Sequence, residues 1–271
     1  MHNPFVPETL EGWSILHLMY RVRWDRVRAL SSGDRAAIAR EAVQALAVPD
    51  AGSTGFVQML GHKADLMVVC FRRTFDELAR AQLALSQTRF HDLIEPTTSY
   101  VSIVELGMYE MTTKVHEQVG AVHKAGSDEF EQAFDAAMEE QRGRVIGRLF
   151  LEMPKRRHVC FYPMNKKRGE AENWYTVPFE KRASMMREHG MIGRHYAGKV
   201  TQVISGSIGY DDWEWGVDLF ADDPLVFKKL IYEMRFDEVS AKFAEFGPFY
   251  IGLQFAPEQL ATLLDGQVPA L

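Results

Sequence analysis

The most constraining feature of the sequence is a strand–helix pattern that occurs once in each half of the chain. The first copy, residues 66–90, reads LMVVCFRRTFDELARAQLALSQTRF, and the second, residues 215–236, reads WGVDLFADDPLVFKKLIYEMRF. In each copy an apolar strand ends in Phe, a helix follows, and the segment closes with Arg-Phe. The apolar face of each strand and helix has to be buried against another element. The approximate repeat therefore predicts two similar modules in one chain.

The segments around each copy complete the two modules. In the first half we expect strands at 13–24, 56–60, 64–71 and 99–108, and helices at 31–46 and from 74 onward. In the second half we expect strands at 199–207, 213–220 and 249–255, a helix at 224–233 and a helical turn through 242. Both halves fit a βαββαβ order, which predicts an α+β fold with paired sheets and helices on the outer face.

The connecting segments set the predicted domain boundaries. Residues 107–143 are polar and helical in pattern, with Ser127-Asp128 as a helix cap, and residues 1–12 are expected to form an arm. We therefore predict an N-terminal module at 1–110, a helical connector at 111–145, a C-terminal module at 146–256 and a C-terminal tail at 257–271. The tail is expected to be a short helix followed by a loose end.

Composition limits the partners and the compartment. The chain of 271 residues is 46% hydrophobic and 25% charged, which is typical of a soluble globular protein. Its net charge of -6 gives no support for nucleic-acid binding. No apolar run approaches the roughly 20 residues of a spanning helix, and no signal peptide is visible, so we expect no membrane insertion. Cys70 and Cys160 lie in apolar runs and are expected to be buried thiols. These features indicate a cytoplasmic protein.

A tyrosine and three cations lie together near the middle of the chain. Tyr162 follows the apolar residues 159–161 and precedes Pro163, which favours an extended backbone for the tyrosine. The run KKR at 166–168 comes shortly after. The ordinary interpretation is a solvated turn beside core aromatic residues. The alternative is a site in which cations bind a carboxylate next to a redox-active phenol.

His189 is a candidate metal ligand. It follows Met185 by four residues and Met186 by three, so it shares a helix face with apolar side chains. Pro178 fits the start of this helix and Gly190 its end. The ordinary interpretation is a helix-terminal histidine that interacts with the helix dipole. The alternative is an imidazole with one nitrogen on a metal and the other on an orienting partner.

Gln202 is a polar residue in an apolar strand. It alternates with Val200 and Ile204, so we expect it to share their face and to point into an apolar interior. An unpaired buried amide costs roughly 1 to 3 kcal/mol, so the side chain needs a partner. That partner is either a backbone group or a bound metal.

Several longer segments together resemble the chlorite-dismutase-like family, and more specifically its coproheme decarboxylase branch. The segments are YPMNKKR at 162–168, NWY at 173–175, REHGMIGRHYAGKV at 187–200, the run at 206–241 and EFGPFYIG at 245–252. The resemblance covers nearly the whole chain and is densest from 148 to 252.

The resemblance implies a fold, an assembly and a reaction. The fold is a dimeric α+β barrel of two tandem ferredoxin-like modules in one chain, assembled as a homopentamer. The reaction is the hydrogen-peroxide-dependent oxidative decarboxylation of two propionates of iron coproporphyrin III (coproheme) to vinyl groups. It gives haem b through a three-propionate intermediate, and coproheme is both substrate and redox cofactor. A transient contact with coproporphyrin ferrochelatase is also implied.

The resemblance also implies roles for individual residues. His189 corresponds to the weak proximal iron ligand, Gln202 to the distal residue, Tyr162 to a radical-forming tyrosine and Lys166 to a lysine that assists the second decarboxylation. Propionate or pocket contacts correspond to Arg148, Met164, Arg194, Trp213, Arg235 and Ser240. Chlorite dismutases carry a distal Arg where this chain has Gln202, which argues against chlorite as a substrate. A non-catalytic haem carrier or sensor is the alternative function, but it needs neither Tyr162 nor Lys166.

Overall fold

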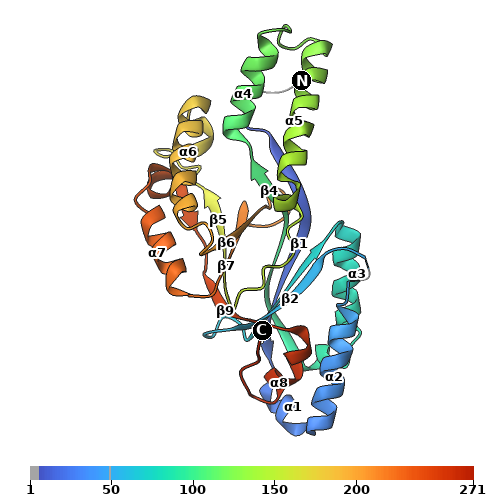
Figure 1. Cartoon of the computed structure of the whole chain (residues 1–271). Helices are drawn as coiled ribbons and strands as arrows, with labels where there is room; N and C mark the ends of the chain where they lie inside the picture. The colour runs from blue at the N-terminus through green and yellow to red at the C-terminus, as the bar shows by residue number, and fades with distance from the viewer. Residues whose placement is uncertain (1–5, 49) are drawn as a thin grey trace.

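The computed structural model describes residues 6–48 and 50–271 and is built around one nine-stranded antiparallel sheet (Figure 1). The first module contributes β1 (Thr9–Val22), β2 (Ser53–Met59), β3 (Leu66–Arg72) and β4 (Ile94–Gly107). The second contributes β5 (His158–Lys166), β6 (Thr201–Gly206), β7 (Trp215–Ala221), β8 (Ala244–Phe246) and β9 (Tyr250–Phe255). The order is β7-β6-β4-β1-β3-β2-β9-β5-β8, and β7 also pairs with β5. This last pairing closes the sheet into a barrel and leaves β8 outside the ring.

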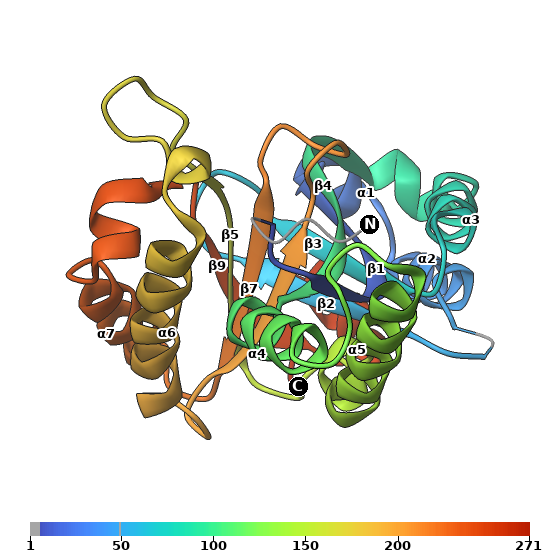
Figure 2. The ribbon, with the colours of Figure 1, turned by 90° about the horizontal axis from the view of Figure 1, so that it is seen from above.

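The helices lie on the outside of the barrel (Figure 2). They are α1 (Trp24–Ala29), α2 (Ser32–Ala45), α3 (Phe75–Ser86), α4 (Tyr109–Gly120), α5 (Asp128–Leu149), α6 (Phe179–His195), α7 (Leu225–Met234) and α8 (Leu260–Leu264), with a π-helix at Val239–Phe243. Short 3-10 turns occur at Arg89–Leu93, Trp174–Thr176 and Pro257–Gln259. The predicted α+β fold of two tandem modules with paired sheets and outer helices is confirmed.

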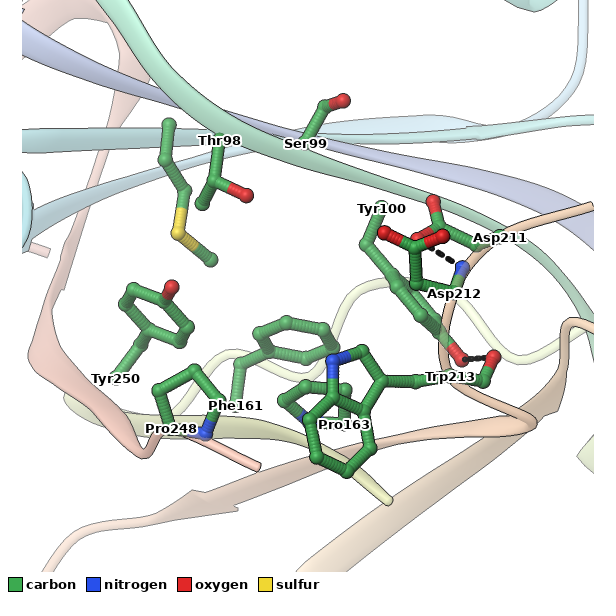
Figure 3. Close-up of a pocket in the computed structure, with 11 residues that line it drawn as sticks. Thr98, Ser99, Tyr100, Phe161, Pro163, Asp211, Asp212, Trp213, Pro248 and Tyr250 are labelled. Carbon is green, nitrogen blue, oxygen red and sulfur yellow. Dashed lines mark hydrogen bonds between the residues drawn. The ribbon is translucent and has the colours of Figure 1, made fainter. Parts of the chain in front are cut away.

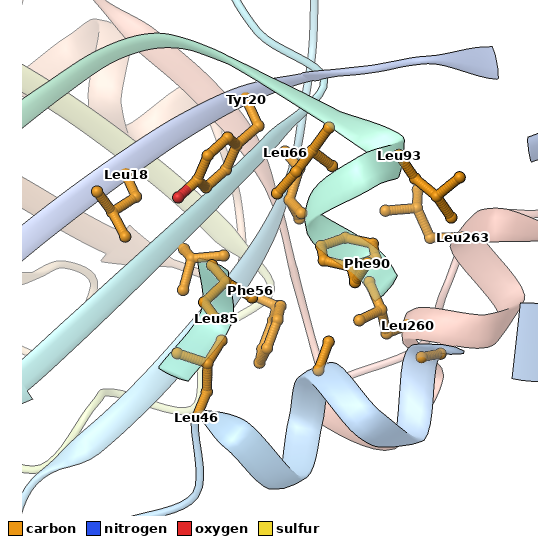
Figure 4. Packing of buried hydrophobic residues seen from close by; sticks show 14 of the residues in the cluster. Leu18, Tyr20, Leu46, Phe56, Leu66, Leu85, Phe90, Leu93, Leu260 and Leu263 are labelled. Atoms are coloured by element: carbon orange, nitrogen blue, oxygen red, sulfur yellow. The ribbon is translucent and has the colours of Figure 1, made fainter. Parts of the chain in front are cut away.

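Alternation along the strands divides the core into layers. Odd-numbered residues of β5, such as Phe161, pack inside the barrel with residues of β1, β3 and β4. Even-numbered residues of β5, such as Tyr162, pack on the outer face with residues of β7 and α7. In the first module the outer face of the sheet packs against α2, α3 and α8 (Figure 4). Because side chains alternate across a strand, β5 contributes side chains both to the barrel interior and to the outer face.

A buried contact between a histidine and an aspartate joins the two modules inside the barrel. His17 on β1 lies 3.0 and 3.1 Å, through its Nε2, from the two carboxylate oxygens of Asp218 on β7. Both side chains are 0% exposed. The imidazole also stacks on the ring of Phe161 on β5, at 4.1 Å between centroids. The contact therefore fixes β1 of the first module relative to β5 and β7 of the second.

Three sequence expectations require correction. The first strand begins at Thr9, so the expected arm is partly a strand, and its residues 1–5 lie outside the described residues. The boundary predicted between 145 and 146 falls inside α5. The C-terminal end is not loose: Leu260, Leu263 and Leu264 are buried against the first module, and the N–H of Ala256 donates to the carbonyl of Ala270. The spacing of these leucines gives the short helix one apolar face, which explains its docking.

We predict that Asp218→Ala lowers the free energy of unfolding by about 3 to 5 kcal/mol, because it leaves the imidazole of His17 buried without its partner. Asp222→Ala is the matched control, since Asp222 follows the same strand and pairs with Arg156 while 63% exposed. An exposed pair of this kind contributes about 0 to 1 kcal/mol. Urea unfolding measures both variants, and equal effects would contradict a special role for the buried pair.

Candidate functional site

The outer face of the second module carries a cross-strand array of side chains. Gln202 on β6 lies opposite Leu219 on β7, which lies opposite Cys160 on β5. One step along, Val217 lies between Ile204 and Tyr162. Residues directly opposite each other in an antiparallel pair project from the same face. The structure therefore brings Tyr162 and Gln202 to one face of the sheet, two strands apart.

Tyr162 is enclosed by aromatic rings. It is 3% exposed, and its ring stacks on Phe249 at 4.6 Å and lies 5.8 Å from Phe246. Burial raises the pKa of the phenol, the charge of Cys160 raises it further, and Arg235 opposes the shift. The phenol therefore keeps its proton throughout the neutral range. Met164 follows on the same face of β5, half-buried in the same cluster and opposite Trp215.

His189 is oriented by a carboxylate from another part of the chain. Its Nδ1 lies 2.8 Å from Oδ2 of Asp237, which is 5% exposed. Asp237 also accepts hydrogen bonds from the backbone N–H and the hydroxyl of Ser240. Burial is the largest influence on Asp237 and favours the neutral acid, but the bonds from His189 and Ser240 together hold its pKa below the ordinary value. An ionised carboxylate only accepts, so Nδ1 donates and Nε2 is left as an acceptor.

The helix that carries His189 differs from its prediction. Gly190 does not end it, because α6 continues to His195. Glycine in a helix interior costs roughly 1 kcal/mol relative to alanine. Here Ile192 and Tyr196 beyond it pack against the outer cluster of the second module, which offsets that cost. His189 thus lies within the helix, 26% exposed, rather than at its dipolar end.

Lys166 is a nearly buried cation at the end of β5. It is 9% exposed, and its ammonium lies 4.8 Å from the centroid of the Trp174 ring. Burial lowers the pKa of the Lys166 ammonium to about 8, while the carboxylates of Asp237 and Glu214 oppose the shift. An even-numbered residue of β5, it continues the face of Tyr162 and Met164. A buried ammonium beside this face is suited to binding a ligand carboxylate.

Gln202 does not point into the interior of the chain. It is exposed, as is Ile204 at 37%, whereas Val203 between them is buried inside the barrel. The predicted alternation is right, but the apolar face that Gln202 shares is open on this part of the sheet. The prediction of a buried amide is therefore wrong for the chain alone, and no buried partner is required.

The three arginines predicted to bind carboxylates lie on three different segments of the chain. Arg148 is exposed in the last turn of α5 and Arg194 is exposed near the end of α6. Arg235 is exposed after α7, with its guanidinium 4.6 Å from the centroid of the Phe246 ring, which itself contacts Tyr162. Arg235 therefore lies next to the Tyr162 face.

Trp213 lines a separate cavity. The cavity has a volume of about 350 Å³ and is lined by Met19, Thr98, Ser99, Tyr100, Phe161, Pro163, Asp211, Asp212, Trp213, Pro248 and Tyr250 (Figure 3). Phe161 and Pro163 alternate with Tyr162 along β5, so the cavity lies on the opposite side of the strand. The structure does not bring Trp213 together with Tyr162.

Sequence reasoning missed three residues of this region. Asp237 is 48 positions from His189, and no local pattern joins them. Trp174 is signalled only by the motif NWY, although its ring lies against both Lys166 and Phe243. Trp215 is the tryptophan that shares the outer face, opposite Met164, and its indole N–H donates to Glu105 on β4.

We predict that Asp237→Asn reverses the tautomer of His189. Oδ1 of Asp237 accepts the backbone N–H of Ser240 at 2.8 Å, so the amide oxygen of the variant is held there. Its NH₂ group then faces Nδ1 and donates to it, which moves the imidazole proton to Nε2. Nitrogen-15 NMR of the imidazole distinguishes the two tautomers.

Glu233→Gln is the matched control for this experiment, because Glu233 lies 3.9 Å from the exposed His195 near the end of the same helix. It is expected to leave the His189 signals unchanged. An unchanged tautomer in the Asp237 variant would contradict the orienting role of the carboxylate.

Comparisons with known proteins agree with this architecture. The family model described as chlorite dismutase matches residues 35–255. A putative heme-binding protein of Haloquadratum walsbyi is 45% identical over 268 residues, which cover 97% of this chain and 48% of that protein. The chain thus spans about half the length of that relative. A coproheme decarboxylase of Staphylococcus saprophyticus is 41% identical over 266 residues, which cover 96% of this chain and 98% of that protein.

A solved structure extends the comparison. A heme-binding protein of Thermus thermophilus matches with a TM-score of 0.81 and 39% identity, over 98% of this chain and 100% of that one. Separately, none of the helices formed by residues 6–48 and 50–271 has both the length and the apolar character needed to cross a membrane. Because the family model covers most of the sequence and full-length relatives share about two fifths of its residues, the chain belongs to the chlorite dismutase family.

Proposed function

We propose that this chain catalyses the hydrogen-peroxide-dependent decarboxylation of two propionates of iron coproporphyrin III, giving haem b through a three-propionate intermediate. The observation that carries the proposal is the placement of a buried phenol, Tyr162, and a nearly buried ammonium, Lys166, on one face of β5. The likeness to the Staphylococcus saprophyticus protein, whose name is coproheme decarboxylase, supports the same reaction.

The donor set fits an iron porphyrin. Asp237 holds the proton of His189 on Nδ1 and leaves Nε2 as the free ligand atom, the arrangement typical of metal-binding histidines. His189 is the residue that would hold the iron, and when bound the iron porphyrin supplies the redox chemistry with peroxide. Gln202, open on the sheet, is the proposed distal residue. Its neutral amide offers neither a strong acid nor a strong base.

The cations fit a substrate with several carboxylates. Lys166 is the nearly buried one, and Arg148, Arg194 and Arg235 are exposed. Guanidinium groups bind carboxylates in bidentate geometry, so the three arginines suit propionates that reach the surface. We assign them, with Met164 and Ser240, to binding the porphyrin. Trp213 stays a predicted contact, although it lines the cavity on the other side of β5 from Tyr162.

The reaction balances for each propionate separately. The propionate side chain, hydrogen peroxide and one proton give a vinyl group, carbon dioxide and two water molecules. The propionate loses two electrons and peroxide gains them. Tyr162 is the proposed carrier of the first electron: its phenol gives up a hydrogen atom, and the resulting phenoxyl takes one from the propionate carbon. The second electron leaves the propionate as carbon dioxide departs and the vinyl group forms, and the bound iron porphyrin would supply the oxidising equivalent that accepts it. Burial keeps this phenol protonated at neutral pH, so the hydrogen atom is present to be transferred.

A haem carrier or sensor is the second candidate. The Haloquadratum walsbyi and Thermus thermophilus relatives are both named as heme-binding proteins. A carrier needs His189 and the cationic contacts but has no use for a buried phenol and a nearly buried ammonium on one face of the same strand. We therefore favour the enzyme. The homopentamer, the ferrochelatase contact and the cytoplasmic location stay predictions from the sequence.

Mass spectrometry of the protein loaded with iron coproporphyrin III and titrated with hydrogen peroxide tests the proposed function. We expect stepwise loss of two carboxyl groups and a shift of the absorption spectrum to that of haem b. Binding without loss of mass would favour the carrier or sensor, and no binding would contradict the role of His189.

We predict that Tyr162→Phe retains coproheme binding but removes detectable decarboxylation, because the phenylalanine ring fills the same aromatic pocket without a transferable hydrogen atom. Tyr232→Phe is the matched control, since Tyr232 is 65% exposed on α7. Binding is measured by spectral titration and turnover by mass spectrometry. Wild-type turnover in the Tyr162 variant would exclude the proposed carrier.

A further inference from the structure

We propose that Glu214 is a positioning residue for Lys166: its carboxylate fixes the lysine at the end of β5 and holds its side chain in the cationic form that binds a substrate carboxylate. This inference rests on the proposed function, in which Lys166 assists the second decarboxylation. It adds a residue of this chain, in the segment before β7, to the site on β5.

Glu214 contacts the end of β5 directly. Its side chain is 9% exposed, and Oε2 accepts the backbone N–H of Lys166 at 2.8 Å. The backbone N–H of Glu214 donates to the side-chain oxygen of Asn165 at 2.8 Å. Two hydrogen bonds therefore tie the residue before β7 to the last two residues of β5. A carboxylate in this position fixes the backbone of Lys166, from which the lysine side chain extends.

The carboxylate also holds the segment that folds over Lys166. Oε1 lies 3.7 Å from Nε of Arg168, and burial, together with the nearby Glu214 carboxylate, raises the pKa of the Tyr175 phenol. Between these two residues the chain turns back through a bridge between Arg168 and Asn173, and the N–H of Trp174 donates to the carbonyl of Lys167. The turn places the Trp174 ring 4.8 Å from the Lys166 ammonium.

The first module contains the same clamp without the lysine. Asp65 precedes β3 as Glu214 precedes β7, and its Oδ2 accepts the N–H of Val22 at 2.8 Å. Val22 is the last residue of β1 and is buried in the outer core of that module. An acidic residue that joins the first strand to the third is therefore a structural feature of both modules. Only in the second module does the clamped residue carry a charge.

The clamp has an electrostatic consequence in the second module. Burial lowers the pKa of the Lys166 ammonium to about 8, and the two carboxylates that oppose this shift are Asp237, beyond α7, and Glu214. No ion pair within 4.0 Å forms at this ammonium in the part of the chain that the structure describes, so both carboxylates act at longer range. The surrounding segments carry further charged or titratable groups, which are Lys167, Arg168, Glu172, Tyr175 and His189. Removing the charge of Glu214 therefore lowers the pKa further, and the ammonium loses its proton at a lower pH.

Glu214→Gln is the sharpest test, because the amide oxygen can still accept the Lys166 N–H while the negative charge is lost. Glu172→Gln is the matched control: Glu172 pairs with Lys167 at 2.8 Å in the same turn. Asp65→Asn is the second control, since it changes the equivalent clamp of the first module. Glu214→Gln removes the charge near Lys166. Glu172→Gln tests whether a weakened turn alone changes the lysine, and Asp65→Asn tests whether a weakened clamp alone does.

The first readout needs no porphyrin. Lysines are dimethylated with carbon-13 formaldehyde, the Lys166 signal is assigned from its absence in Lys166→Arg, and its pH titration is followed by NMR. We expect a lower Lys166 pKa in Glu214→Gln and the wild-type value in both controls. Equal values in all four proteins would overturn the inference. If Glu214→Gln does not fold, Glu214→Asn replaces it, because the shorter amide also removes the negative charge, and an unchanged Lys166 pKa there has the same meaning.

The second readout follows the two decarboxylations separately by mass spectrometry as a function of pH. In Glu214→Gln we expect the three-propionate intermediate to accumulate and the alkaline limb of the second step to move to lower pH, with the first step unchanged. A wild-type pH profile for the second step would overturn the inference. If the wild-type protein itself shows no loss of mass, the proposed function fails, and the NMR comparison still decides whether Glu214 controls Lys166.

Discussion

The fold depends on a polar contact inside an otherwise apolar barrel. The carboxylate of Asp218 and the imidazole of His17 are completely shielded from water, and their contact joins strands from the two modules. A buried pair is costly to break because each partner alone is left unsatisfied, so the contact favours one placement of β1 relative to β7 across the barrel. Phe161 stacks on the imidazole from β5. The strand that carries the candidate site is thus held by the same contact that joins the modules.

Along β5, alternate side chains belong to the barrel core and to the candidate site. Residues that point inward, such as Phe161, meet the barrel core, whereas Tyr162 points outward toward the helices of the second module. Because a slip of one residue would exchange the two sets, the barrel core determines that Tyr162 and Lys166 face outward together. The cavity lined by Trp213 lies behind this strand and is a feature of the barrel interior, not of the outer face.

The sequence predicted the modules well because apolar alternation and helix caps are local signals. Contacts across long separations were not predictable: nothing local joins Asp237 to His189 or β5 to β7. Alternation placed Gln202 on the right face but did not show that this face is open. Trp213 and Trp215 are two residues apart, yet Trp213 precedes β7, so the alternation of the strand does not extend to it and the two rings serve different surfaces.

The two copies of the repeated unit differ at the residue that their acidic clamps hold. The second copy, residues 215–236, is bordered by Glu214 and Asp237, and these two carboxylates act on Lys166 and His189. The first copy is bordered by Asp65, which clamps the apolar Val22 in the same geometry. A backbone clamp needs only an acceptor, so its charge is surplus to the fold. In the second module the clamped residue is a lysine, so the surplus charge acts at longer range on a cation, and the structural hydrogen bond becomes part of the proposed carboxylate-binding site.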